Sequence, residues 1–219
     1  MLLRFAAIVA FVAGSVGAQA ATLSLSPTAD GSMRVNINGT AINETDPTVT
    51  TLRSGATNDG RGFFIFDLSG IAAGSTIGAA TFGATFTGTP TNTVSDFALR
   101  LDAFGGDGII DTSDYAATAS RFYDVTRPRT EVTAGDRLEV SASLLSQAVQ
   151  GALTTGFLTV RSSTANFATI NFASSENTTY NAPSLSIEFT PPAEVPLPAG
   201  GVLLLGALGA AVLLRRRRG

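Results

Sequence analysis

The chain has 219 residues and a formal net charge of −3, and it contains no histidine, cysteine or tryptophan. Without histidine and cysteine, Ser-His-Asp hydrolysis, cysteine nucleophiles and the usual zinc and copper sites are excluded. The fold also has no disulfides, so burial of side chains must hold it together.

Residues 1–20 have the order of a secretory signal peptide. Arg4 precedes an apolar run from Phe5 to Val12, and small residues follow. The segment ends at Ala18-Gln19-Ala20, which fits the small-x-small cleavage pattern, with Ala18 and Ala20 as the small residues. We therefore expect cleavage before Ala21 and export of the remaining chain.

Between residues 21 and 190 short apolar runs alternate with turn residues, which is typical of an all-β domain. We expect one antiparallel β-sandwich, jelly-roll-like, with a single short helix. A hairpin turn is expected at residues 29–32. The expected strands are Thr22–Thr28, Met33–Ile37, Thr48–Arg53, Arg61–Leu68, Thr76–Thr87, Asp96–Phe104, Arg121–Val125, Arg137–Val140, Gly156–Arg161, Ala168–Phe172 and Ser184–Phe189.

The segment Arg61–Leu68 is the strongest strand of the chain. Alternation places Phe64, Phe66 and Leu68 on one face, where each buried side chain contributes about 1.5 to 3 kcal/mol. The expected helix is Ser143–Leu153, whose apolar residues recur at helical spacing. We expect Ser141 or Ser143 to be its N-cap and the helix to close one end of the sandwich.

The loop from Gly105 to Tyr115 carries three carboxylates, Asp107, Asp111 and Asp114. Its Asp-Gly-x-Ile order is similar to part of an EF-hand loop, in which glycine turns the chain and isoleucine packs inward. The first two ligand positions of such a loop would be Ala103 and Gly105, which offer no side-chain oxygen. Two interpretations therefore stay open, a weak calcium site and a solvated acidic loop. We expect no other cofactor.

Charge limits the partners of the exported part. Without the two terminal segments the chain keeps nine arginines against seventeen acidic residues, a net charge of −8. Such an acidic domain argues against nucleic acid and against anionic membrane surfaces as partners.

The C-terminal segment has three parts in a fixed order. After a linker at residues 191–194, the motif Val195, Pro196, Leu197, Pro198 and Ala199 precedes an apolar run from Gly200 to Leu214. The chain closes with Arg215, Arg216, Arg217 and Arg218. The arginines resist translocation, whereas the apolar run is shorter than the roughly 20 residues of a comfortable membrane span. We expect residues 195–219 to hold a precursor in the inner membrane for sorting; an ordinary C-terminal anchor is the alternative.

This C-terminal segment resembles the PEP-CTERM class of bacterial sorting signals, in the variant whose motif reads VPLPA. The resemblance implies that a membrane-embedded exosortase cleaves near the proline motif. It further implies delivery of the protein to the cell surface or to an extracellular polysaccharide matrix.

Three central pieces, Arg61–Phe82, Leu138–Arg161 and Phe172–Phe189, resemble in order the DNRLRE family of extracellular β-sandwich domains. Some members of that family are classed as carbohydrate-binding modules. In the last piece Glu176 lies in a serine-rich loop and needs a cation nearby. We expect it to pair with Arg61 and so to pin the loop to the strongest strand.

The expected function is that of a non-catalytic structural or adhesion module. The first alternative is a carbohydrate-binding domain that uses Phe, Tyr and Asn or Asp side chains. The second is a carboxylate-based glycan-active enzyme. An exposed row of aromatic side chains in a shallow groove would favour the first alternative, and two carboxyl groups facing each other across a cleft would favour the second.

Overall fold

The computed structural model describes residues 19–36, 39–43, 46, 48–53, 58–93 and 95–193. All of the strands and helices it describes lie in one compact unit, Gln19–Pro192. Ala20 is exposed and precedes the first strand. Ala18, the proline motif, the apolar run after it and the four terminal arginines lie outside the described residues. Within the described ranges, no helix is long and apolar enough to cross a membrane.

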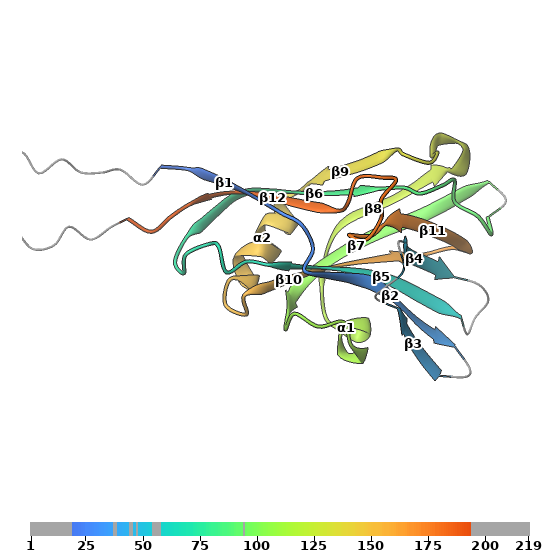
Figure 1. Ribbon diagram of the computed structural model, residues 1–219, viewed down its shortest axis with the longest axis horizontal. Helices are drawn as coiled ribbons and strands as arrows, with labels where there is room; N and C mark the ends of the chain where they lie inside the picture. Colours follow the sequence, from blue (N-terminus) through green and yellow to red (C-terminus); the bar gives the residue numbers. More distant parts are fainter. Residues whose placement is uncertain are drawn as a thin grey trace, which may run out of the picture. The chain divides into compact units, whose positions relative to one another are not determined.

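The chain forms two antiparallel sheets, which confirms the all-β class (Figure 1). The smaller sheet has the order β1 (Ala21–Leu25), β12 (Ser184–Thr190), β6 (Thr76–Thr85), β9 (Arg137–Ser141). The larger has the order β11 (Ala168–Ala173), β4 (Thr48–Arg53), β5 (Asp59–Asp67), β10 (Phe157–Thr164), β7 (Asp96–Gly106), β8 (Ser120–Pro128). In addition, β2 (Ala29–Asn36) pairs with β5 and with β3 (Gly39–Asn43).

The main core lies where the two sheets face each other. Phe64 and Phe66 of β5 meet Phe82 of β6 there, and all three rings are fully buried. The ring centroids of Phe64 and Phe82 are 5.4 Å apart, a favourable tilted contact. Aromatic and aliphatic side chains from both sheets thus form one continuous apolar layer.

The opposite face of β5 is buried as well, although the sequence predicted only one buried face. Phe63 and Ile65 form a second core with Met33 of β2 and with Ile110. Ile110 belongs to the segment that leads into α1 (Thr112–Ala116). In Figure 1 this short helix lies on the side of the larger sheet that faces away from the smaller one. A strand covered on both faces reads as a continuous hydrophobic run, which explains the Phe-Phe-Ile-Phe sequence.

The helix α2 (Ser143–Ala152) buries Leu145, Val149 and Ala152 and contacts strands of both sheets, as expected of a helix that closes the sandwich. The expected serine cap is wrong. The N-cap is Ala142, without a side-chain hydrogen bond. Ser141 ends β9, and its hydroxyl donates to the Ala80 carbonyl instead. The helix is anchored by Gln150, whose side chain accepts from the Ile77 amide and donates to the Ser75 carbonyl.

Three local expectations need correction. Residues 29–32 belong to β2 and form no hairpin turn, and β1 and β2 lie in different sheets. Residues 38–47, for which the sequence predicts no strand, contain β3, and the acidic loop contains most of α1, so the described part has two α-helices instead of one. In each case pairing or packing against β5 and its neighbours overrides weak local propensity.

Candidate functional site

A buried ion network lies on the larger sheet, where three neighbouring strands bring opposite charges together. Asp102 of β7 stands directly opposite Arg161 of β10 on one side and Arg121 of β8 on the other. Arg161 Nη2 lies 3.2 Å from Asp102 Oδ2, and Arg121 Nε lies 3.0 Å from Asp102 Oδ1. Each carboxylate oxygen therefore has its own guanidinium partner. Such a closed arrangement compensates a buried charge.

Arg161 also holds α1 against the sheet. Its Nη1 donates to the carbonyl oxygens of Asp114, Tyr115 and Ala117, at 2.9, 3.1 and 3.1 Å. These carbonyls lie at the C-terminal end of the helix and at its C-cap Ala117, where few backbone donors remain; the Asp114 carbonyl also accepts from the Ala117 amide at 3.4 Å. Burial lowers the pKa of Arg161, and the neighbouring Asp102 opposes that shift.

Tyr115 makes the second connection between α1 and the sheet. The Arg61 guanidinium lies 4.0 Å from the centre of its ring and donates to its carbonyl oxygen. Its hydroxyl donates to Asp59 Oδ2 at 2.7 Å. Burial, together with the Asp59 carboxylate, raises the pKa of Tyr115 to about 12. The phenol therefore stays neutral and acts as a hydrogen-bond donor.

The three carboxylates of the acidic loop serve the local backbone. Asp111 is the N-cap of α1 and accepts from the Ser113 amide at 2.7 Å, while Asp114 accepts from the Asp111 amide at 3.2 Å. Asp107 accepts from the Ile109 amide at 3.1 Å. Among the described residues, no three acidic side chains are grouped so that they could hold a metal ion. Asp111 thus caps a turn, as the second interpretation of this loop expects, but Asp114 is 5% exposed and burial raises its pKa, so the loop is not solvated along its whole length.

The expected ion pair between Arg61 and Glu176 does not form. Arg61 pairs with Asp59 at 3.6 Å, and none of the ion pairs within the described ranges includes Glu176. The reason is the pleat. Arg61 lies on the same face of β5 as Phe63, whereas Glu176 lies beside Asp30, which stands opposite Phe64.

Asp30 is a buried carboxylate that sequence reasoning missed. It is 2% exposed, and its Oδ2 accepts from the Ser175 amide at 2.7 Å. Its Oδ1 is buried without a hydrogen-bond partner. Burial raises the pKa of Asp30 to about 6; the bonds from Ser175 oppose this, and Glu176 adds to it. The Asp30-Gly31 dipeptide looks like a turn, so no local signal marks a buried acid.

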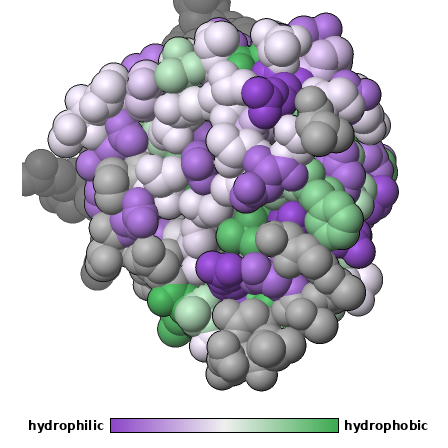
Figure 2. All heavy atoms as spheres, turned by 90° about the vertical axis from the view of Figure 1, so that its right-hand side faces the viewer, coloured by the Kyte–Doolittle hydropathy of each residue, from purple (hydrophilic) through white to green (hydrophobic). Residues whose placement is uncertain are grey.

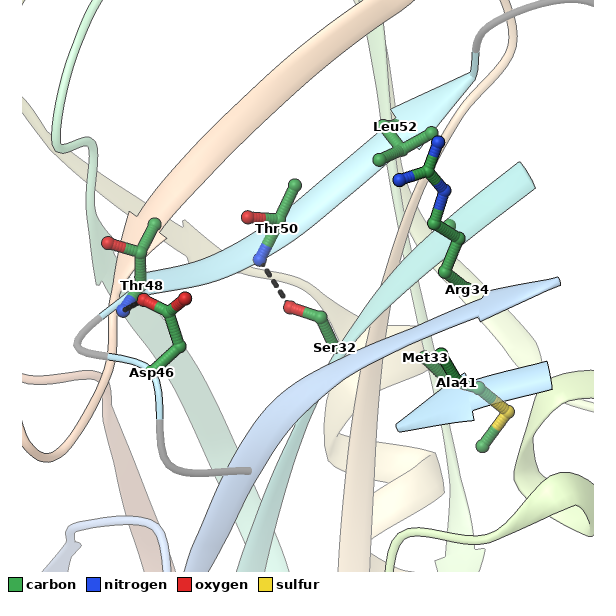
Figure 3. A pocket seen from close by; sticks show the side chains of 9 residues that line it. Ser32, Met33, Arg34, Ala41, Asp46, Thr48, Thr50 and Leu52 are labelled. Carbon is green, nitrogen blue, oxygen red and sulfur yellow. Dashed lines mark hydrogen bonds between the residues drawn. The ribbon is translucent and has the colours of Figure 1, made fainter. Parts of the chain in front are cut away.

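A pocket of about 250 Å³ opens where β4 diverges from the hairpin of β2 and β3 (Figure 3). A Cβ atom at Gly62 would lie 2.5 Å from both Ser162 Oγ and Val49 Cγ1, so glycine is needed for β4 to come this close to β5. The polar groups of β4 that face the pocket are already engaged. Ser32 Oγ accepts from the Thr50 amide at 2.6 Å, and Asp46 accepts from the Thr48 amide at 3.0 Å.

A second, shallower pocket of about 350 Å³ lies beside Phe167, which belongs to the loop that connects β10 to β11. Its lining consists of Asn92, Thr93, Ser95, Asp96, Asn166 and Phe167. Phe167 is 59% exposed. The backbone around it is fixed, because Asn166 Oδ1 accepts from the Ala98 amide at 2.9 Å and Asn92 Nδ2 donates to Thr169 Oγ1 at 2.8 Å.

The Phe167 pocket combines an exposed ring with a carboxylate. No ion pair or hydrogen bond within the described ranges uses the Asp96 carboxylate. A pocket lined by an exposed ring and a carboxylate suits a small ligand with apolar and hydroxyl groups. Phe167 is the one phenylalanine among the large exposed hydrophobic residues of the described part, so it does not form a row.

Figure 2 shows the end of the molecule on the right-hand side of Figure 1. Hydrophilic and intermediate residues cover most of what is coloured there, and hydrophobic residues appear as separate spots. The coloured part of this face shows no broad apolar patch of the kind found at obligate protein interfaces.

No family model matches the chain, and no curated protein matches it.

Proposed function

We propose that this chain is an exported β-sandwich of jelly-roll-like arrangement that acts as a non-catalytic structural or adhesion module. Its setting is the cell surface or an extracellular polysaccharide matrix. The main support is the closed state of its richest polar site. The side chains of Arg161 and Asp102 are 8% and 6% exposed, and both oxygens of Asp102 accept from arginines. Nη1 and Nη2 of Arg161 bond to carbonyls at the end of α1 and to Asp102, while its Nε is buried without a hydrogen-bond partner. Such a buried network supports a fixed scaffold at this place in the sheet.

The proposed route to the surface rests on both ends of the sequence. A signal peptidase cleaves before Ala21, and an exosortase-type membrane protease cleaves near residues 195–199 while the apolar run and Arg215–Arg218 hold the precursor in the inner membrane. The test is the mass of the protein in fractions of the native cells. The expected surface form lacks residues 1–20 and ends near the proline motif.

A pair of variants makes that test specific. Replacing Pro196 and Pro198 with alanine should leave the precursor in the membrane fraction. Pro191→Ala, in the preceding linker, serves as the control and should be processed like the natural chain. Equal processing of both variants, or an intact precursor free in the cytosol, would contradict the proposed route.

Carbohydrate binding is the second candidate, and the Phe167 pocket favours it. The exposed ring offers a flat apolar surface for a sugar ring, while Asp96 offers a carboxylate to its hydroxyl groups. A glycan array with the full chain tests this, with Phe167→Ala as the variant. Ile109→Ala is the matched control, because Ile109 is 62% exposed on another loop. We expect binding to be lost in Phe167→Ala alone. No binding by the natural chain would remove this candidate and leave the structural one.

The enzyme alternative lacks a comparable observation. Each of the two pockets described above holds one carboxylate, Asp46 or Asp96. Glycoside hydrolysis needs two carboxyl groups on either side of the scissile bond. The geometry of these pockets therefore favours a binding or structural role over hydrolysis.

A further inference from the structure

Asp30 and Glu176 are neighbouring acids, and no ion pair within the described ranges includes either of them. Asp30 begins β2, and Glu176 lies in the loop between β11 and β12, residues 174–183. The Ser175 amide donates to Asp30 Oδ2 at 2.7 Å, so this end of the loop is attached to β2 through Asp30. The Ser175 hydroxyl donates to Glu176 Oε1 at 2.8 Å, so Ser175 is bonded to both carboxylates, of which Asp30 is buried and Glu176 is exposed.

The charged groups on the elements around Asp30 are engaged elsewhere. On β5, Arg61 pairs with Asp59 on the opposite face of the sheet. On β2 itself, Arg34 Nε donates to Asn58 Oδ1. On β4, Arg53 donates to the Ala165 carbonyl. Glu176 is the charged group whose field acts on Asp30 most strongly, and it has the same sign.

Two neighbouring carboxylates cannot both be ionised at low cost when one of them is buried. Asp30 Oδ1 is buried without a partner, and a proton on that carboxyl group would let it donate to the neighbouring Glu176. Glu176 is suited to accept, because hydrogen bonds from Ser175 and Ser174 overcome the effect of burial and lower its pKa. The pKa of Asp30 is thus raised and that of Glu176 is lowered, so that Asp30 is the group to carry a shared proton and Glu176 the group to accept its hydrogen bond.

We propose that Asp30 and Glu176 share one proton, and that this proton latches the β11–β12 loop to β2 in mildly acidic surroundings and releases it when it is lost. The loop is held by other groups at its far end, where Arg137 donates to the Ala182 carbonyl and to Ser184 Oγ. The latch therefore controls the Ser174–Glu176 end alone. It gives an exported protein a loop that responds to the pH outside the cell.

The pH dependence of loop release follows from the difference in the pKa of Asp30 between the closed and the open loop. Burial raises the pKa of Asp30 to about 6 in the closed loop, while an open, solvated Asp has a pKa of about 3.9. The closed form thus holds the proton more tightly, and its advantage is complete below pH of about 4. It is lost as the pH rises through about 6, when two negative groups face each other.

The first test is a carboxyl-carbon NMR titration of the full chain. The Asp30 resonance should have its midpoint at about pH 6. Glu176→Gln removes the like charge and should lower that midpoint by about one pH unit. The control Glu188→Gln makes the same charge change on an exposed residue of β12 and should leave the midpoint where it is.

The second test is amide exchange, corrected for the intrinsic effect of pH. The Ser175 amide should exchange about tenfold faster at about pH 7.5 than at about pH 5. The amides of Thr179 and Tyr180, which donate to Asn177 Oδ1 within the same loop, should not change.

Three results would overturn the latch. One is an Asp30 midpoint below about pH 4.5, near the value of a solvated acid. Another is a midpoint that Glu176→Gln leaves unchanged. The last is a midpoint that falls on addition of millimolar calcium and returns with a chelator, which would mean that a cation and not a proton joins the pair.

Discussion

Asp102 and Asp30 are both aspartates buried in the larger sheet, at 4% and 2% exposure, but their charges are handled differently. Asp102 stands in a central strand, and its cross-strand neighbours on both sides are arginines, Arg161 and Arg121. Asp30 stands opposite Phe64 and faces a loop that brings another acid. Strand register therefore decides which buried acid obtains a cation and which one needs a proton.

The largest effect is expected from removing the cation on the Asp102 side. Arg161→Met keeps much of the side-chain volume but leaves Asp102 with Arg121 as its one guanidinium partner and removes the Arg161 donor from the carbonyls of Asp114, Tyr115 and Ala117. Breaking a buried pair from one side costs about 3 to 5 kcal/mol. Denaturant unfolding near neutral pH measures this free energy. A loss below about 1 kcal/mol would mean that Arg121 and water compensate the charge of Asp102 without Arg161. The contrast between Asp102 and Asp30 would then not depend on Arg161.

Asp30→Asn should increase the free energy of unfolding near neutral pH, whereas Arg161→Met should decrease it. In the folded chain burial raises the pKa of Asp30 to about 6, so the native state binds a proton there that the unfolded state releases above about pH 4. The natural chain therefore loses stability as the pH rises through 6, and asparagine, which mimics the protonated acid, does not. We expect Asp30→Asn to be more stable than the natural chain by about 1 to 3 kcal/mol at pH of about 7.5 and equal to it near pH 4.

Parallel urea titrations of Asp30→Asn and the natural chain at several pH values check this prediction. Asp67→Asn, a change of the same kind in a turn where Asp67 Oδ1 accepts from the Ser69 amide, is the control and should show no gain at high pH. A loss of stability in Asp30→Asn at every pH would show that the carboxylate of Asp30 is stabilising in its ionised form.

The sequence predicts best those strands that bury many apolar side chains. Alternating or continuous apolar residues mark β4, β5, β6 and β7, because each of these strands buries side chains on one face or on both. The strand β3 and the helix α1 escape prediction, since Gly39–Asn43 and Thr112–Ala116 carry too few apolar residues to show a period. The conformation of β3 depends on its pairing with β2. The conformation of α1 depends on Arg61 and Arg161, which are far away from it in the sequence.

The candidate site is harder to predict for the same reason. Asp102 looks like the polar member of an alternating strand, and its arginines lie 19 and 59 residues away. Asp30 looks like part of a turn. The predicted pair of Arg61 and Glu176 used two residues of the right charge but ignored the pleat, which places them on opposite faces of β5. To predict which charged residues pair across a sheet, one needs the register of its strands, and a single sequence does not supply that register.

Tyr115→Phe should have a moderate effect and sharpens the comparison through its pH dependence. The change removes the hydroxyl that donates to Asp59 Oδ2 but keeps the ring under Arg61, so we expect a loss of about 1 kcal/mol. Because burial and Asp59 raise the pKa of Tyr115 to about 12, above the usual value of about 10, its contribution is complete below pH 10. The loss should thus be constant between about pH 5 and about pH 9, unlike the effect of Asp30→Asn. A loss that varies with pH in this range would indicate that Tyr115 is coupled to another titrating group.

The smallest effect is expected at an exposed pair of the same chemistry. Arg127 Nε lies 3.5 Å from Glu131 Oε2, and the two side chains are 35% and 55% exposed. Water screens such a pair and can replace either partner, so Arg127→Gln should change the free energy of unfolding by no more than about 0.5 kcal/mol. Added salt should shrink even this difference, whereas it should hardly affect the loss in Arg161→Met. If Arg127→Gln were as costly as Arg161→Met, burial would not be what distinguishes the ion pairs of this protein. The contrast between Asp102 and Asp30 would then need a cause other than register.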